Sequence, residues 1–157
     1  MDMTEEKTRC MTHAPQSVAE LIAELPAENV RAIAKYGCCA FSLLWALGFE
    51  IAESVRAIET LSHMIDAKAI GKDCTVYWTE AIRFVTGKTA FVEFLTVNDE
   101  KELKNLKGRI IVRYDYGNHS HWVGMENGKV AYNSLKESRC VSFGHPTAVR
   151  IIHINED

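Results

Sequence analysis

Residues 36–45 read YGCCAFSLLW, a glycine and two cysteines followed by an apolar run. This pattern predicts a helix from position 38 to 47 that is buried on most sides and carries a thiol in its first turn. Gly48 is the residue expected just past its end. The N-terminus of a helix favours a thiolate over a thiol, because its unpaired N–H groups and positive dipole end stabilise negative charge. The segment therefore raises the question of whether the chain also supplies a base.

Length and composition exclude several classes of protein. A chain of 157 residues, 47% hydrophobic and 25% charged, is typical of one globular domain. The net charge is −3 without a basic cluster, which argues against nucleic acid as a partner. The apolar runs are too short to cross a bilayer, so no membrane association is expected. Residues 1–9 lack the features of a secretory signal, and five scattered cysteines do not form a disulfide framework. These observations favour a cytoplasmic protein.

The order of the expected elements predicts an α+β fold. Residues 1–16 show no period and are interpreted as a loose tail, and residues 17–157 as a single domain that opens on a capping box. Apolar spacing predicts helices over 17–25, 27–35, 51–70 and 73–87, and a small helix over 98–106. Short segments rich in β-branched and aromatic residues predict strands over 89–95, 109–114, 121–125, 129–133, 139–143 and 148–154. Helices followed by an antiparallel sheet define this class.

His121 and Asn133 are the candidates for a base and for the group that orients it. A cysteine nucleophile needs a base to take its proton and a partner that fixes the tautomer of that base. His121 opens one expected strand and Asn133 ends the next, with the turn residues Asn127-Gly128 between them. A two-residue loop would send the two side chains to opposite faces, whereas a three-residue loop would set them opposite each other. We therefore predict the three-residue loop.

Together these motifs resemble papain-like cysteine peptidases, and most closely the small bacterial group that includes the double-glycine leader peptidases. The likeness rests on a glycine-cysteine pair that opens a helix, with Ser42-Leu43 following, and on a later His-Trp-Val strand. It covers about residues 37–134. It implies a papain-like fold in which the nucleophile helix packs on a C-terminal antiparallel sheet. It also implies Cys38 as nucleophile, His121 as general base and Asn133 as orienting group.

The oxyanion donor departs from the pattern of this family. Such enzymes usually carry a glutamine about six residues before the cysteine, and this chain has Ala32 there. The backbone N–H of Cys38 could supply one donor, and Asn29 or another residue the second. Losing one such donor typically costs on the order of 100- to 1000-fold in rate. Trp122, beside the base, is expected to wall the cleft.

Other uses of these residues remain open. Cys39 is an alternative to Cys38 as the nucleophile, and His119 is an alternative to His121 as the general base. Cys10 and His13 have the spacing C-x-x-H, but no second ligand pair follows, so neither a metal nor another cofactor is expected.

The sequence predicts cysteine-dependent hydrolysis of a peptide or amide bond in a peptide or protein substrate. The alternatives are a catalytically weak or inactive module of the same fold that binds a protein partner, and a thiol acyltransferase.

Overall fold

The computed structural model describes residues 22–49, 55–135 and 138–156. Over these residues the chain combines helices with one antiparallel sheet, so the predicted α+β class is confirmed. The predicted tail over 1–16 and the start of the first helix at 17 lie outside the described residues, as does the start of the helix predicted over 51–70.

Helices come first along the chain and strands follow. The helices are α3 (Ala27–Tyr36), α4 (Cys38–Ala46), α5 (Val55–Asp66), α6 (Trp78–Thr86) and α7 (Arg139–Phe143), with a 3₁₀ helix η1 (Glu100–Leu103). The strands are β1 (Ala90–Thr96), β2 (Arg109–Tyr116), β3 (His119–Glu126), β4 (Lys129–Tyr132) and β5 (His145–Ile154). They form one sheet in the order β1-β5-β2-β3-β4, and every neighbouring pair is antiparallel.

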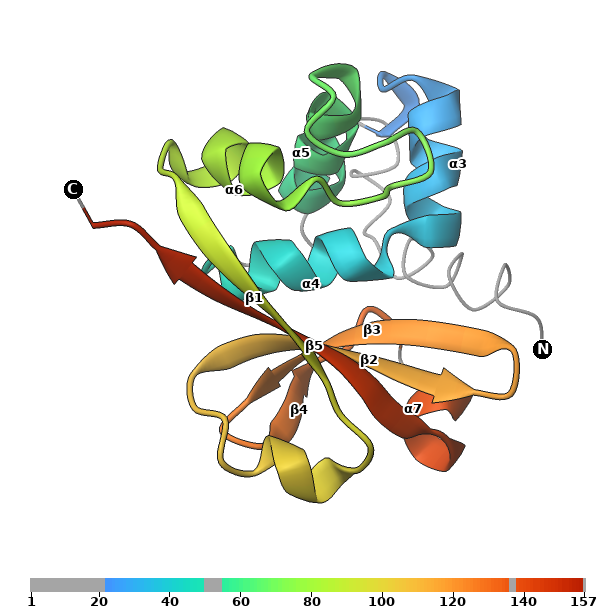
Figure 1. The fold of residues 1–157 in the computed structure, drawn as a ribbon. Helices are drawn as coiled ribbons and strands as arrows, with labels where there is room; N and C mark the ends of the chain where they lie inside the picture. The colour runs from blue at the N-terminus through green and yellow to red at the C-terminus, as the bar shows by residue number, and fades with distance from the viewer. Residues whose placement is uncertain (1–21, 50–54, 136–137, 157) are drawn as a thin grey trace.

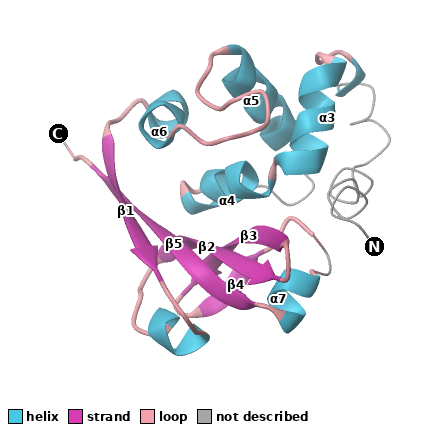
Figure 2. Ribbon diagram, turned by 45° about the vertical axis from the view of Figure 1, so that its right-hand side comes forward, coloured by secondary structure: helices cyan, strands magenta, loops and turns pink. Residues whose placement is uncertain are grey.

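Both faces of the sheet are covered, so the protein has two cores. Helices α3 to α6 gather on one side, with α4 nearest the sheet, whereas η1 and α7 lie on the other side (Figures 1 and 2). The core on the side of the long helices includes Leu43, Leu61 and Ile111, and the second core includes Leu103, Val123 and Cys140. Strand β2 is buried almost continuously because its side chains enter both cores.

The predicted strand over 139–143 is wrong, because these residues form α7. The chain leaves the edge strand β4 and must reach β5 on the far side of β2, so this segment turns instead of pairing. Two helical bonds close it, from Ser142 N–H to Ser138 O and from Gly144 N–H to Cys140 O, each at 3.0 Å. Sequence alternation could not reveal that the sheet positions on both sides of β2 were already occupied.

Helix α6 begins later than predicted. Residues 73–77 form a turn in which the Asp73 carboxylate accepts a hydrogen bond from Thr75 N–H at 3.0 Å, and Ile70 and Val76 form an isolated bridge. An aspartate can bond to the backbone two residues on in this way, and such bonds compete with helix formation. The helix itself starts only at Trp78.

A glycine allows α4 to lie close to the sheet. The indole ring of Trp45 covers Gly124 of β3 so tightly that any Cβ atom there would collide with it. Trp45 also stacks on Tyr132 of β4 at 6.3 Å between ring centroids, and the guanidinium of Arg109 lies 4.5 Å from its ring. These contacts fix the C-terminal half of α4 on the strands that carry the candidate site.

No helix in the described part of the chain is long and apolar enough to cross a membrane.

Candidate functional site

Cys38 is the first residue of α4, as the sequence predicts, and its side chain is 6% exposed. Only Gly37 separates α3 from α4, and a Cβ atom there would collide with the carbonyl oxygen of Ile33 and press on the ring of Phe41. Glycine is therefore required for the tight junction that places Cys38 at the start of α4.

Ser42 joins the first turn of α4 to the strand of His121. Its hydroxyl donates to the carbonyl oxygen of Cys38 at 2.8 Å and lies 3.4 Å from the carbonyl oxygen of Trp122. Ser42 is fully buried, so this contact is shielded from water. The backbone beside Cys38 and the backbone beside His121 are thereby held together.

The buried His121 and the half-buried Asn133 form a hydrogen-bonded pair. His121 Nε2 lies 2.6 Å from Asn133 Oδ1, and the histidine is fully buried. Asn133 Oδ1 also accepts the backbone N–H of Leu135 at 3.0 Å, which identifies this amide atom as the oxygen. An oxygen acceptor requires that Nε2 carry the proton, so in the neutral ring Nδ1 holds the lone pair. Among the described residues Nδ1 has no hydrogen-bond partner.

The predicted three-residue loop is wrong, but His121 and Asn133 meet nevertheless. Glu126 pairs with Lys129, so the loop is the two-residue turn Asn127-Gly128, with both φ angles positive at 53° and 82°. A bulge in β4 corrects the register, because Val130 pairs with Met125 and Tyr132 with Gly124, which leaves Ala131 as an extra residue. The bulge turns Asn133 to the face of His121, where the two are diagonal neighbours.

The edge of β3 beside His121 has no paired strand among the described residues. Ser120 and Trp122 line a pocket with Cys38, so strand alternation points the imidazole of His121 to the other side of β3. In the described part of the chain, β4 pairs with β3 only over residues 124–126. Among the described residues the strand therefore has no paired neighbour at His121 on that side.

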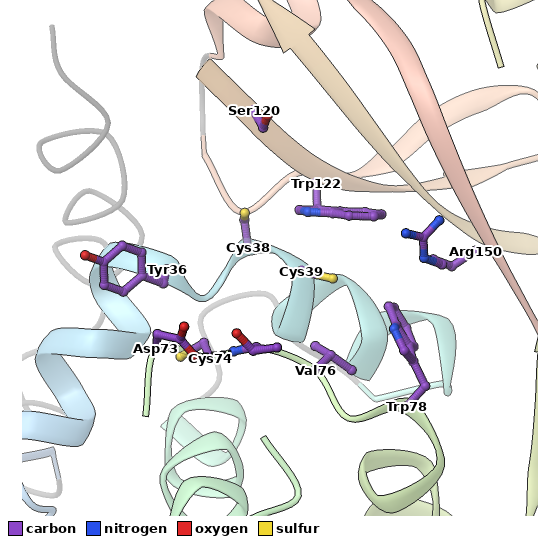
Figure 3. A pocket seen from close by; sticks show the side chains of 11 residues that line it. Tyr36, Cys38, Cys39, Asp73, Cys74, Val76, Trp78, Ser120, Trp122 and Arg150 are labelled. Atoms are coloured by element: carbon purple, nitrogen blue, oxygen red, sulfur yellow. Dashed lines mark hydrogen bonds between the residues drawn. The ribbon is translucent and has the colours of Figure 1, made fainter. Parts of the chain in front are cut away.

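The pocket beside Cys38 has a volume of about 370 Å³. Figure 3 shows the sulfur of Cys38 directed toward the sheet, with the ring of Trp122 lying beside it, so Trp122 forms a wall of the pocket. Cys39 lines the same pocket, but burial raises the pKa of its thiol well above the usual value, and a neighbouring Cys38 charge raises it further. Cys39 therefore stays a neutral thiol near pH 7 and is a poor nucleophile.

Asn29 is not an oxyanion donor in this structure, which corrects the expectation from sequence. Its amide nitrogen donates to Ser62 Oγ at 3.1 Å and to Asp66 Oδ1 at 3.0 Å, and it lines a different pocket, between α3 and α5. These bonds tie two helices together and occupy the donor. Ala32 lies against the helix core.

The competing residues differ in their surroundings. His119 is exposed at the start of β3, whereas His121 is buried. Cys10 and His13 lie outside the described residues. Within residues 22–49, 55–135 and 138–156, no three His, Cys, Asp or Glu side chains form a group that could hold a metal ion.

Arg150 is a charged residue of the pocket that the sequence analysis did not propose for the site. Arg150, in the middle of β5, lines the pocket together with Cys38 and Trp122 (Figure 3). The sequence carries a signal for it, since a single arginine interrupts the apolar run AVRII at 148–152. Burying a charge at the centre of a strand costs free energy unless a partner compensates it.

Comparisons with protein-family models, with curated proteins and with solved structures found no match to this chain.

Proposed function

We propose that the protein is a cysteine-dependent hydrolase of peptide or amide bonds with a papain-like arrangement of Cys38, His121 and Asn133. The observation that carries the proposal is the hydrogen bond between buried His121 and Asn133, which leaves Nδ1 as an unpartnered acceptor among the described residues. A buried polar atom without a partner calls for an explanation, and a general base that awaits its proton supplies one.

The position of Cys38 supports the same proposal. Its thiol lies at the N-terminus of a nine-residue helix, where negative charge is stabilised, and Ser42 ties that turn to the strand of His121. The proposal requires that the sulfur of Cys38 meet Nδ1 of His121 at the edge of β3 that no described strand covers. Trp122 would shield the resulting ion pair from water on the pocket side.

The mechanism follows from these roles. Nδ1 of His121 takes the proton of Cys38, and the thiolate attacks the carbonyl carbon of the scissile bond. The tetrahedral intermediate collapses as His121 returns the proton to the leaving amine, which breaks the C–N bond and leaves an acyl-enzyme. His121 then takes a proton from water, and the resulting hydroxide attacks the carbonyl carbon of the thioester. The C–S bond breaks, which releases the acid product and regenerates the thiolate of Cys38. Proton transfer by a placed histidine contributes about 100- to 10,000-fold.

The alternative is a protein-binding module of the same fold with weak or no catalysis. It is favoured by one observation, namely that the residue considered for the second oxyanion donor, Asn29, is used in helix packing.

Alkylation of the cysteines with iodoacetamide at pH 7, read site by site by mass spectrometry, separates the two functions. An ordinary thiol is only a few per cent thiolate at this pH, so an activated Cys38 should react roughly tenfold or more faster than Cys10. His121→Ala should remove the difference, and His119→Ala, two positions away, is the matched control that should preserve it. Equal and slow labelling of Cys38 and Cys10 in the wild-type protein would contradict hydrolysis and favour the binding module.

A further inference from the structure

Arg150 is held between two aromatic rings in the middle of the sheet. On β5 it pairs with Phe94 of β1 and Ile111 of β2, so its backbone is fixed from both sides. Its guanidinium carbon lies 3.9 Å from the ring centroid of Phe94 and 5.2 Å from that of Trp122. Such stacking orients the planar guanidinium while leaving its N–H edges available for hydrogen bonds.

The guanidinium lacks the carboxylate partner that neighbouring arginines have. Arg109 pairs with Glu126 at 3.4 Å and Arg113 with Asp115 at 3.3 Å, but among the described residues Arg150 has no ion pair. Its Nη1 donates to the carbonyl oxygen of Val149, the preceding residue, at 3.1 Å. Its buried Nε has no hydrogen-bond partner among the described residues. Most of its five donors thus lack an acceptor in the part of the chain that the structure describes.

The positive charge is not neutralised by the rest of the pocket. The thiol of Cys39 lines the same pocket, but burial raises its pKa well above the usual value, so it is neutral near pH 7. Asp73 lines the same pocket but lies near Tyr36, on the other side of Cys38 from Arg150 (Figure 3). Burial lowers the pKa of Arg150, a charge on Cys39 would raise it, and the charge of Arg113 lowers it, so an anion beside the guanidinium would offset the cost of its burial.

We propose that Arg150 binds a carboxylate of the substrate, so that Cys38 acts on an amide bond within about two residues of an acidic group. This inference rests on the proposed function. A carboxylate offers the two parallel acceptors that match a guanidinium edge. A pocket of about 370 Å³ is at the small end of the range for ligand sites and suits one or two residues between the thiol and the anchor. The carboxylate is supplied either by an acidic side chain or by the end of a peptide.

The decisive experiment compares two alkylating reagents that differ only in charge. Iodoacetate and iodoacetamide both form an S–C bond with the Cys38 thiolate and release iodide, but only iodoacetate carries a carboxylate. The ratio of their rate constants at Cys38 is measured at pH 7 by mass spectrometry, in a Cys39→Ala background that removes the adjacent thiol. The same ratio in the urea-unfolded protein provides the reference.

The ratio at Cys38 should exceed that of the unfolded protein about fivefold, because the positive charge of Arg150 attracts the iodoacetate anion across the pocket. Arg150→Gln should abolish the excess, and Arg150→Lys should retain part of it. Arg83→Gln, on the exposed face of α6, is the matched control and should change nothing. Thermal unfolding of each variant confirms that it is folded. An unchanged ratio in a folded Arg150→Gln protein would overturn the proposal.

Protection of Cys38 from iodoacetamide by short peptides identifies the source of the carboxylate. Acetyl-Gly-Gly-Glu-amide carries it on a side chain, acetyl-Gly-Gly-Gly carries it at the chain end, and acetyl-Gly-Gly-Gln-amide is the neutral control. The result is separable from the proposed function. If His121→Ala leaves the iodoacetamide rate at Cys38 unchanged while Arg150→Gln still lowers the ratio, the anion site stands and the hydrolase falls.

Discussion

Asn133 faces His121 because one extra residue, Ala131, bulges out of β4 between the turn and the asparagine. Val130 and Tyr132 have consecutive partners on β3, Met125 and Gly124, so Ala131 occupies a position with no counterpart. Its side chain is exposed. The bulge thus reconciles a two-residue turn with an asparagine that must point to the face of the histidine.

Deleting Ala131 should therefore preserve the site. Without it the ladder becomes regular, and Tyr132 and Asn133 keep the partners and the faces that they have now. We expect the rate of iodoacetamide labelling of Cys38 in the deletion variant to lie within about threefold of wild type, since no partner of the imidazole is removed. A loss as large as that of Asn133→Ala, in a protein that still unfolds cooperatively, would show that the bulge itself shapes the site.

Asn133→Ala should slow the chemistry of Cys38 without unfolding the protein. The substitution removes the acceptor of the His121 Nε2 proton and that of the Leu135 N–H. Loss of a partner for buried polar groups costs about 1–3 kcal/mol, which is roughly 5- to 150-fold if it appears fully in the rate. The second-order rate constant of Cys38 labelling checks this. Asn127→Ala, in the turn of the same hairpin, is the control, and equal effects of both variants would contradict a role in orienting the imidazole.

The parts of the molecule that sequence predicts well are those determined by neighbours along the chain. The glycine, the cysteines and the apolar run specify α4 locally, and the dipeptide Asn127-Gly128 specifies a hairpin. The loop length was mispredicted because this dipeptide suits two turn types, and the bulge that compensates lies outside the turn. Distant contacts decide the remaining cases. Asn29 donates a hydrogen bond to Ser62 of α5, which is distant in sequence. The place of Arg150 in the pocket becomes visible only in the fold, where its guanidinium lies near the ring of Trp122.

Asn29→Ala should destabilise the protein and leave its thiol chemistry intact. The amide nitrogen of Asn29 donates hydrogen bonds to Ser62 and Asp66 on α5, and its removal leaves these acceptors without that donor. We expect the free energy of unfolding in urea to fall by about 1–3 kcal/mol. Cys38 labelling should stay within about twofold of wild type under native conditions. A large loss of labelling at unchanged stability would instead indicate that Asn29 takes part in the chemistry of Cys38.

Gly124→Ala should weaken the docking of α4 on the sheet. The new methyl group would occupy the place of the Trp45 ring, and such overpacking typically costs about 1–3 kcal/mol. The cost should largely vanish in a Trp45→Ala background, because the ring that collides is then absent. Urea unfolding of the wild type, both single variants and the double variant measures this coupling. Additive effects would mean that the glycine is needed for a reason other than the indole.

Tyr114 should make the protein sensitive to alkali. Burial, the charge of Glu100 and the hydrogen bond to Glu100 Oε1 at 3.4 Å together raise the pKa of its phenol to about 12, and burial is the largest cause. Because the folded-state pKa lies above the ordinary value of about 10, the stabilising contribution is complete below pH 10 and is lost as the pH rises toward 12. The loss is at most about 2–3 kcal/mol for a shift of this size.

The test follows the free energy of unfolding in urea at pH 9, 10, 11 and 12. Tyr114→Phe cannot ionise at this position, so its stability should fall less than that of the wild type across the interval. Tyr77→Phe removes an exposed phenol and should follow the wild-type curve, which separates the buried group from the general effect of alkali. Parallel curves for the wild type and Tyr114→Phe would show that the phenolate is as well tolerated in the fold as in the unfolded chain.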